Sequence, residues 1–201
     1  MSDGTFSGAK VLVVGGAGFV GSNLVHQILP QDPREILVVD NLISSDVSNI
    51  PADSCVRFVF GSITDDRILA GLPGDLDYAF HLACFHGNQS SIADPFADHT
   101  YTSLKLFDRL KEIKRLKKVV YAAAACAVAE KTYDAPTATT EDQPVTLYHD
   151  SPYSISKIIG ELYGNYYFQQ HRLPFVRARF SNVFGPREIL GAGQWRGTVH
   201  T

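Results

Sequence analysis

The sequence predicts an α/β protein whose strands form one doubly wound parallel sheet. Two observations predict this class: short apolar runs alternate with longer amphipathic stretches, and a glycine-rich turn follows the first run. Nearly uninterrupted runs of Val, Leu and Ile are typical of parallel strands that are covered on both faces. Regular alternation of strand and helix favours right-handed crossovers in such a sheet.

Six runs are expected as strands and three stretches as helices. The strands are Lys10–Val14, Ile36–Asp40, Val56–Phe60, Tyr78–Ala83, Lys118–Ala124 and Phe175–Ala178. The helices are Phe19–Leu29, Pro95–Glu112 and Pro152–His171. In the last helix, the helical spacing places six apolar residues on one side: Ile155, Ile158, Ile159, Leu162, Tyr163 and Tyr166.

Composition and charge limit the possible function. Of 201 residues, 45% are hydrophobic and 19% are charged, which is ordinary for a globular protein. A net charge of −3 gives no electrostatic reason to expect nucleic acid or an anionic membrane as a partner, and no apolar run is long enough to cross a bilayer. We expect a cytoplasmic protein in which Cys55, Cys84 and Cys126 are reduced thiols of the core, with no metal site.

Three glycines follow the first expected strand and open the first helix. Gly15, Gly18 and Gly21 allow a tight turn, a close approach of pyrophosphate to backbone N–H groups, and close packing of the helix on the strand. The positive end of the helix, with Phe19 and Val20 in its first turn, then faces the phosphates. The turn therefore predicts a Rossmann site for a dinucleotide.

An acidic residue ends the second expected strand. Asp40 lies about 20 residues after the last glycine, where a carboxylate can hold the ribose hydroxyls of the adenosine half. Because a carboxylate repels a 2′-phosphate, Asp40 favours NAD over NADP. The alternative is that Asp40 and Asn41 only form a turn at the strand end.

A tyrosine and a lysine stand four residues apart at the start of the third expected helix. Pro152 suits the first turn of that helix, and the spacing of Tyr153 and Lys157 places phenol and ammonium on one face. A nearby cation favours the phenolate. Such a tyrosine can take the proton of a sugar hydroxyl while hydride leaves the same carbon for the nicotinamide.

With these motifs in place, the chain resembles the extended short-chain dehydrogenase/reductase family, and within it the nucleotide-sugar epimerases and dehydratases of bacterial surface-polysaccharide and lipopolysaccharide synthesis. Five stretches carry the resemblance: the glycine turn, Val38–Leu42, His81–Ala83, Tyr153 with Lys157, and Arg179–Pro186 (RFSNVFGP).

The resemblance implies a role for each matching residue. Tyr153 would be the catalytic base and Lys157 would bind the nicotinamide ribose. Beside the glycine turn and Asp40, the implied cofactor contacts are Asn41, Leu42, Ser62, Ile63, Leu82 and Ala83. Asn182 and Ala124 would lie at the substrate.

The resemblance also implies an assembly and a domain division. The helices around 95–112 and 152–171 resemble those that form a four-helix homodimer interface in this family. Residues 1–180 would form the NAD-binding domain, and 181–201 would be the start of a substrate-binding region that is truncated, since family members are considerably longer.

The chain departs from the family pattern at several positions. Family members carry Ser or Thr where this chain has Ala124, and Cys126 or Thr139 are the nearest residues that could replace the missing hydroxyl. Ser62 stands where the adenine contact is usually Asp. The usual Asn of the fourth helix has no clear counterpart near His99.

Dehydratases place acidic residues directly after the catalytic Thr, whereas Ala123–Ala127 contains no carboxylate. Elimination therefore favours an epimerase that acts on a nucleotide sugar, with a UDP-sugar expected, by hydride abstraction and return through a keto intermediate. Two alternatives stay open: an NAD-binding protein or fragment without catalysis, and a nucleotide-sugar dehydratase. A steroid or flavonoid reductase is disfavoured, because many of those prefer NADP.

Overall fold

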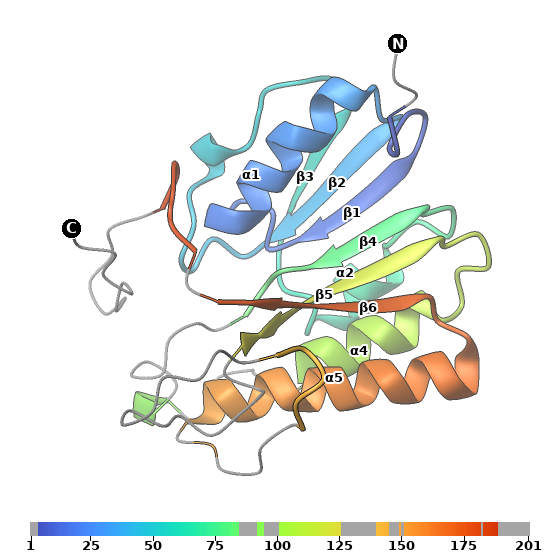
Figure 1. Ribbon diagram of the computed structural model, residues 1–201. Coiled ribbons are helices and arrows are strands. Elements are labelled where there is room, and N and C mark those ends of the chain that lie inside the picture. The colour runs from blue at the N-terminus through green and yellow to red at the C-terminus, as the bar shows by residue number, and fades with distance from the viewer. Residues whose placement is uncertain are drawn as a thin grey trace.

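The computed structural model describes residues 4–84, 92–94, 101–125, 140–144, 149, 151–181 and 183–188. Its centre is a six-stranded parallel sheet in the order β3-β2-β1-β4-β5-β6 (Figure 1). The strands are β1 (Lys10–Val14), β2 (Glu35–Asp40), β3 (Val56–Phe60), β4 (Tyr78–His81), β5 (Lys118–Ala124) and β6 (Phe175–Phe180). The strand order reverses between β1 and β4, and ligands of open α/β sheets bind beyond the carboxyl ends at such a point.

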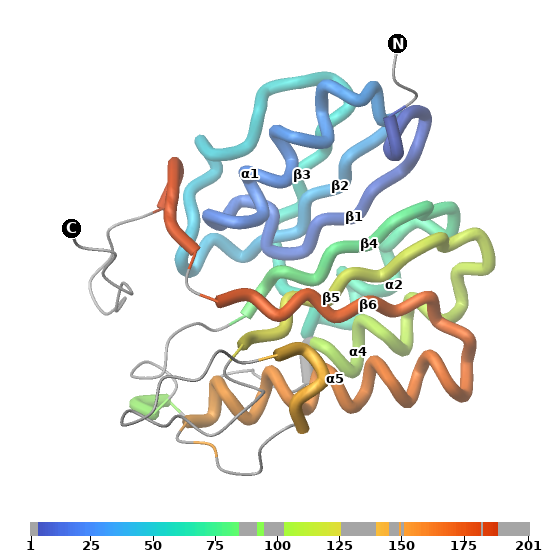
Figure 2. The backbone as a smooth tube through the Cα atoms, in the orientation of Figure 1, coloured from blue at the N-terminus to red at the C-terminus, as the bar shows by residue number. Residues whose placement is uncertain are grey.

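Helices flank the sheet on both faces. They are α1 (Phe19–Ile28), α2 (Asp66–Ala70), α4 (Tyr101–Leu110) and α5 (Pro152–His171), with short 3₁₀ turns at Leu29–Gln31 and Val47–Asn49. α1 packs on the half of one face formed by β1, β2 and β3, and α2, α4 and α5 lie against the other face (Figures 1 and 2). This arrangement confirms the predicted doubly wound α/β fold. No described helix is long and apolar enough to span a membrane.

Two glycines let α5 lie unusually close to the sheet. A Cβ at Gly160 would stand 2.2 Å from the hydroxyl oxygen of Tyr121, and a Cβ at Gly164 would stand 2.0 Å from the Phe175 ring. Both rings project from the strands beneath, β5 and β6, into the larger of the two core clusters. The space that glycine leaves is therefore filled by aromatic side chains, and a larger residue at either position would push the helix off the sheet.

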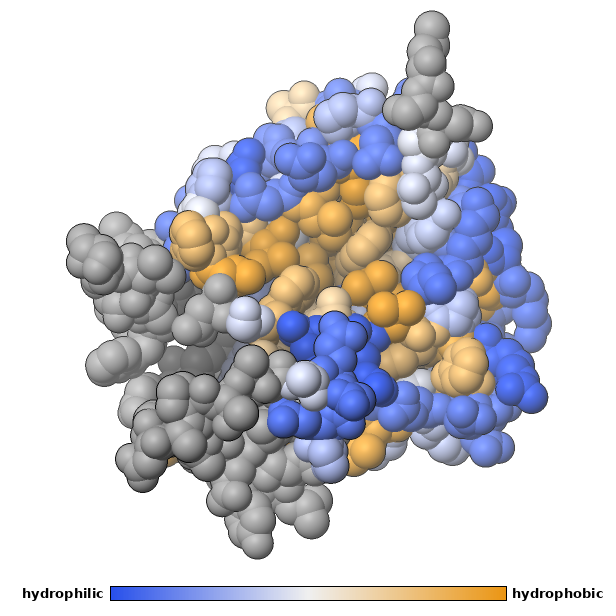
Figure 3. Space-filling view, in the orientation of Figure 1, coloured by the Kyte–Doolittle hydropathy of each residue, from blue (hydrophilic) through white to orange (hydrophobic). Residues whose placement is uncertain are grey.

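One part of the sheet carries apolar side chains that no helix in the described part of the chain covers. On the α1 side, β4, β5 and β6 present the open sheet face, which we define as Phe80, Val120, Val176, Ala178 and Phe180. All five are partly or fully exposed, with Val176 at 40%. Figure 3 shows apolar residues gathered over these strands between α1 and α5.

The predicted boundaries differ from the observed ones where backbone bonds change direction. β4 ends at His81 rather than Ala83, because the N–H groups of Leu82 and Ala83 both donate to the carbonyl of Val14 at the end of β1. β6 continues to Phe180, since Ala124 still pairs with it. The sequence did not predict α2, which is only five residues long. Of the helix expected over 95–112, residues 95–100 lie outside the described part.

Candidate cofactor and catalytic site

The glycine turn leaves β1 and enters α1 at the switch point of the sheet. Gly15 has φ of +79°, and a Cβ there would lie 2.6 Å from the backbone nitrogen of Ala83. A Cβ at Gly21 would lie 2.1 Å from the carbonyl oxygen of Gly15. Both obstacles are backbone atoms that cannot rotate away, so the turn needs glycine at these two positions.

The remaining glycine of the motif, Gly18, is less closely surrounded. Gly18 is the N-cap of α1 and gives the helix no side-chain hydrogen bond, and the first turn carries no acidic residue. A Cβ at Gly18 would meet only the Gly15 carbonyl oxygen, at 3.3 Å. The first N–H groups of a helix have no intrahelical partner. This uncapped, uncharged N-terminus fits a diphosphate, which supports the predicted place of the cofactor.

Asp40 is 8% exposed at the end of β2, and its carboxylate organises the turn beside it. Oδ2 accepts from the Ala17 N–H at 3.0 Å, and Oδ1 accepts from the Leu42 N–H at 2.9 Å and from the Ser45 hydroxyl at 2.8 Å. Leu42 has φ of +57°. Asp40 thus stabilises a turn, as the alternative interpretation expects. It also lies at the end of β2, where a residue that binds the adenosine ribose is expected.

Asn49 adds a contact that the sequence did not predict. Its side-chain amide donates to the carbonyl of Ala17 at 3.0 Å, while the N–H of Ala17 donates to the Asp40 carboxylate. The peptide groups around Ala17 are therefore held from two sides. Ser45 and Asn49 follow Asp40 by five and nine residues, but nothing in their spacing signals these contacts.

The other predicted cofactor contacts line the same carboxyl edge in different ways. Ser62 and Ile63 follow β3: the Ser62 hydroxyl accepts from the Thr64 hydroxyl at 2.8 Å, and the Ile63 side chain is buried in the core at 2% exposure. Leu82 and Ala83 lie half-buried beside Gly15, while Asn41 is exposed.

The start of α5 has the features that the sequence predicts. Ser151 is the N-cap, its hydroxyl accepts from the Ser154 N–H at 3.2 Å, and Pro152 lies in the first turn. Lys157 is only 4% exposed, and its ammonium donates to the Ala122 carbonyl at 2.7 Å. The same ammonium lies 5.5 Å from the centre of the Tyr153 ring. Phenol and ammonium thus stand together on the side of α5 that faces β5.

A buried neutral histidine lies behind Lys157. His81 is 1% exposed, and its Nε2 lies 3.1 Å from the Ser103 hydroxyl. Its Nδ1 has no partner among the described residues. Burial, with a smaller contribution from the Lys157 charge, lowers the pKa of His81 to about 3. The imidazole therefore stays uncharged at neutral pH and adds no positive charge beside Lys157.

The remaining predicted residues are the substrate-side positions and the cysteines. Ala124 is the last residue of β5 and is 6% exposed. Asn182, Cys126 and Thr139 lie outside the described residues. The expectation of core thiols is wrong for Cys55 and Cys84, which are half-buried near strand ends. Among the described residues, no group of three or more His, Cys, Asp or Glu could hold a metal ion.

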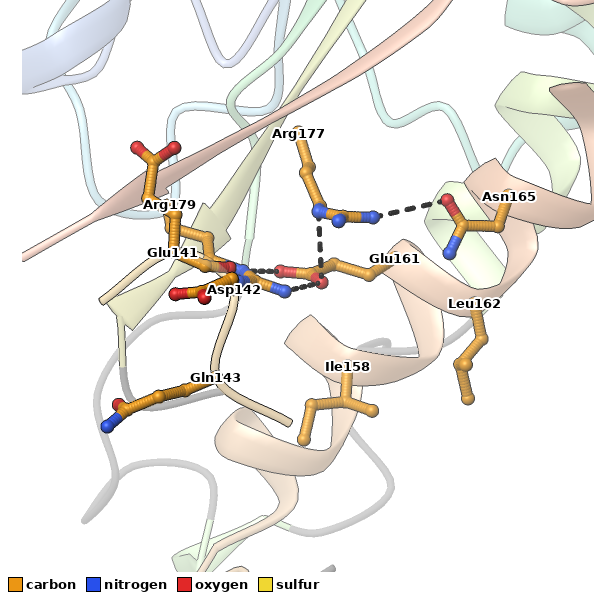
Figure 4. A pocket seen from close by; sticks show the side chains of 9 residues that line it. All are labelled: Glu141, Asp142, Gln143, Ile158, Glu161, Leu162, Asn165, Arg177 and Arg179. Carbon is orange, nitrogen blue, oxygen red and sulfur yellow. Dashed lines mark hydrogen bonds and ion pairs between the residues drawn. The ribbon is translucent and has the colours of Figure 1, made fainter. Parts of the chain in front are cut away.

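A second polar cluster joins α5 to β6 and was not expected. Arg179 donates from Nε and Nη2 to the two oxygens of Glu161, both at 2.8 Å, and from Nη1 to the Glu141 carbonyl at 3.0 Å. Glu161 is 3% exposed and lies one helical turn after Lys157. The pair borders a cavity of about 220 Å³ between α5, β6 and residues 141–143 (Figure 4). Arg177 lies across the same cavity and reaches Glu161 at 3.7 Å.

Comparison with known proteins places this geometry in a family. Residues 11–197 match the NAD dependent epimerase/dehydratase family. The structure resembles the Bordetella bronchiseptica enzyme WbmF in complex with NAD⁺, at 55% identity and a TM-score of 0.83, over 98% of this chain and 56% of that chain. It also resembles the epimerase Mth375 of Methanothermobacter thermautotrophicus, at 36% identity and a TM-score of 0.84, over 92% of this chain and 55% of that one.

A curated relative of named activity matches at similar length. The UDP-glucose 4-epimerase of Mycolicibacterium smegmatis is 34% identical over 190 residues, which are 89% of this chain and 58% of the relative. The chain thus spans just over half the length of the proteins it resembles. Because the family match covers most of the chain, the conclusion is plain: this chain belongs to the NAD-dependent epimerase/dehydratase family, whose cofactor is the one that the glycine turn and Asp40 predict.

Proposed function

We propose that this chain is the NAD-binding part of an epimerase that acts on a nucleotide sugar, with a UDP-sugar as substrate. The observation that carries the proposal is the buried Lys157, whose ammonium is fixed by the Ala122 carbonyl beside the Tyr153 ring. A buried cation next to a phenol favours the phenolate, which is the form that a proton acceptor needs.

Each part of the site has a separate task. The first turn of α1 binds the diphosphate through backbone N–H groups, and Asp40 accepts hydrogen bonds from ribose hydroxyls. Lys157 binds the second ribose, and Tyr153 takes a proton from the sugar hydroxyl and later returns it. When bound, NAD accepts and returns the hydride. His81, being neutral, adds no second positive charge beside Lys157.

The substrate class rests on two supports. WbmF of Bordetella bronchiseptica has been crystallised with NAD⁺ and UDP, and the Mycolicibacterium relative is a UDP-glucose 4-epimerase. Relatives also include dTDP-glucose 4,6-dehydratases. Removal of a hydroxyl needs an acid next to the reacting carbon, whereas Ala123, Ala124 and Ala125 carry none. This favours epimerisation, with residues 181–201 as the start of the substrate-binding region.

Calorimetric titration of the 201-residue chain with NAD and NADP tests the cofactor half of the proposal. We expect NAD to bind and NADP to bind more weakly, and Asp40→Ala to reduce that preference. Equal binding of both dinucleotides, or binding of neither, contradicts the proposed site. For the substrate half, a longer form of the protein that converts no nucleotide sugar in an NMR assay contradicts the epimerase assignment.

A second candidate is an NAD-binding protein without catalysis, and one observation favours it. Ala124, at the end of β5, has no hydroxyl for the reacting group, and loss of one positioned donor slows a reaction by about 10²–10³. The substitution Ala124→Ser in the longer form separates the two candidates. A large gain in turnover supports an enzyme with a surviving catalytic frame, and absence of turnover in both forms supports binding alone.

We propose further that the protein is a homodimer through the outer sides of α4 and α5. The support is a stripe on α5 in which Ile155, Leu162 and Tyr166 are exposed at 45%, 59% and 50%. These residues follow helical spacing along one side of the helix, opposite the side that carries Lys157 and Glu161. Exposed apolar stripes of this kind mark interaction surfaces.

A further inference from the structure

Residues 183–188, which follow β6, lie against the start of α1, although the two segments are far apart in the sequence. Asn23, in the second turn of α1, donates from its side-chain amide to the Phe19 carbonyl at 2.9 Å and to the Pro186 carbonyl at 2.9 Å. Its Oδ1 accepts from Nη1 of Arg187 at 2.7 Å. One side chain thus joins the start of α1 to a segment more than 160 residues further along the chain.

The backbone of that segment is fitted to the contact. Arg187 has φ of +67°, a left-handed conformation that is uncommon for a residue other than glycine. Such a conformation costs free energy and persists only when surrounding bonds hold it. Gly185 also has a positive φ, and a Cβ there would stand 3.6 Å from the Phe19 ring. The segment therefore lies against the same helical turn that Asn23 holds.

We propose that Asn23 and Arg187 form a latch which couples the cofactor site to the substrate-side segment 183–188. Asn23 and Arg187 are positioning residues in this proposal, which rests on the proposed binding of the NAD diphosphate at α1. The latch holds the Phe19 carbonyl and leaves the N–H groups of the first turn available. A first turn already fixed from outside binds the diphosphate better, since less ordering remains to be done on binding.

The coupling has to be reciprocal. If the closed latch strengthens NAD binding by some factor, bound NAD must stabilise the closed latch by the same factor. The side chain of Arg187 also brings a positive charge to the positive end of α1, where an anion is already favoured. Closing the latch and binding the cofactor therefore support each other.

Hydrogen exchange on the 201-residue chain tests the latch. Saturating NAD should slow exchange in a peptide covering 183–188 by about fivefold or more, the lower end of typical coupling between sites. Asn23→Ala should abolish this protection and weaken NAD binding by the same factor, measured by calorimetry. Arg187→Met should do the same, whereas Arg187→Lys keeps a donor and should retain part of the effect. Gln27→Ala, one turn further along the same helix, is the matched control and should change neither quantity.

The outcomes separate the latch from the cofactor assignment. If NAD binds but segment 183–188 gains no protection, or if the protection survives Asn23→Ala, the latch is wrong and the cofactor site stands. If Asn23→Ala lowers thermal stability while NAD affinity and protection stay as in the unchanged chain, the contact is only structural and the latch is again overturned. If NAD does not bind at all, the proposed function and the latch fail together.

Discussion

α1 and α5 both approach the sheet through glycines, but they expose different groups to the site. In α1, Gly21 lies against the backbone of the turn, 2.1 Å from the Gly15 carbonyl for an added Cβ. In α5, Gly160 and Gly164 lie against aromatic side chains of β5 and β6. In the proposed site, the first helix offers backbone N–H groups to a ligand, and the second offers side chains.

The two helices also bury different residues. The buried side of α1 contains Ser22, Val25 and Ile28, whereas the buried side of α5 contains the charged Lys157 and Glu161 at 4% and 3% exposure. Its apolar residues at 155, 162 and 166 are on the outside. α5 thus turns its polar side toward the core, where Lys157 is paired with the Ala122 carbonyl and Glu161 with Arg179.

The largest expected effect concerns a buried charge of α5. Glu161→Ala leaves Arg179 without its partner, and breaking a buried pair in this way costs about 3–5 kcal/mol of unfolding free energy. Arg177→Ala removes a half-exposed ion pair at 3.7 Å and an exposed hydrogen bond to Asn165, and should cost about 0–1 kcal/mol. Urea denaturation measures both. Equal costs would mean that the Arg179 fork does not hold α5 on β6.

The next effect concerns the backbone contact of α1. Gly21→Ala places a methyl group against the fixed carbonyl of Gly15 and should cost about 3 kcal/mol, at the upper end for overpacked sites. Gly18→Ala meets one backbone oxygen at 3.3 Å and loses a favourable N-cap residue, so it should cost less, about 1 kcal/mol. Because its methyl group enters the proposed diphosphate site, Gly18→Ala should also weaken NAD binding. Similar stability of the two variants would contradict the role assigned to Gly21.

A third effect depends on pH and involves the buried His81 at the end of β4. Since burial lowers the pKa of His81 to about 3, the unfolded chain binds a proton between pH 6.5 and 3 that the folded chain does not. Stability should therefore fall as pH falls, by about 2 kcal/mol between pH 7.5 and pH 5. His81→Gln should remove this slope whatever its own stability is. An unchanged slope would show that another group titrates in this range.

The smallest effect on stability is expected on the outer side of α5. Leu162→Glu replaces an exposed residue and should change the unfolding free energy of the monomer by about 0.5 kcal/mol or less. It should nevertheless abolish the proposed dimer, which light scattering measures. Glu112→Gln is a control at an exposed position beyond α4. A dimer that survives Leu162→Glu would place the interface elsewhere.

The sequence predicts the strands, the helices and the glycine turn better than it predicts pairs of polar side chains that are distant in the sequence. Strands β1, β3 and β5 and helix α5 have the predicted bounds, because apolar runs and a proline-led helix are local signals. The glycine turn is also predicted, because the spacing of its glycines is a local signal, although Gly15 lies against the backbone of the distant Ala83. The pairing of Glu161 with Arg179, and of Asn23 with Arg187, depends on the tertiary fold, and neither has a local pattern.

The open sheet face has a consequence for how the chain behaves in solution. Phe80, Val120 and Val176 stand side by side across three strands, as the parallel register requires. Contact through such a surface gains strength from salts that are excluded from proteins, such as sulfate, whereas contacts between charges weaken as salt is added. This chain should therefore precipitate at a low concentration of sulfate. If its association increases with sulfate, the contact is made through the apolar sheet face; attraction between charged side chains would weaken instead.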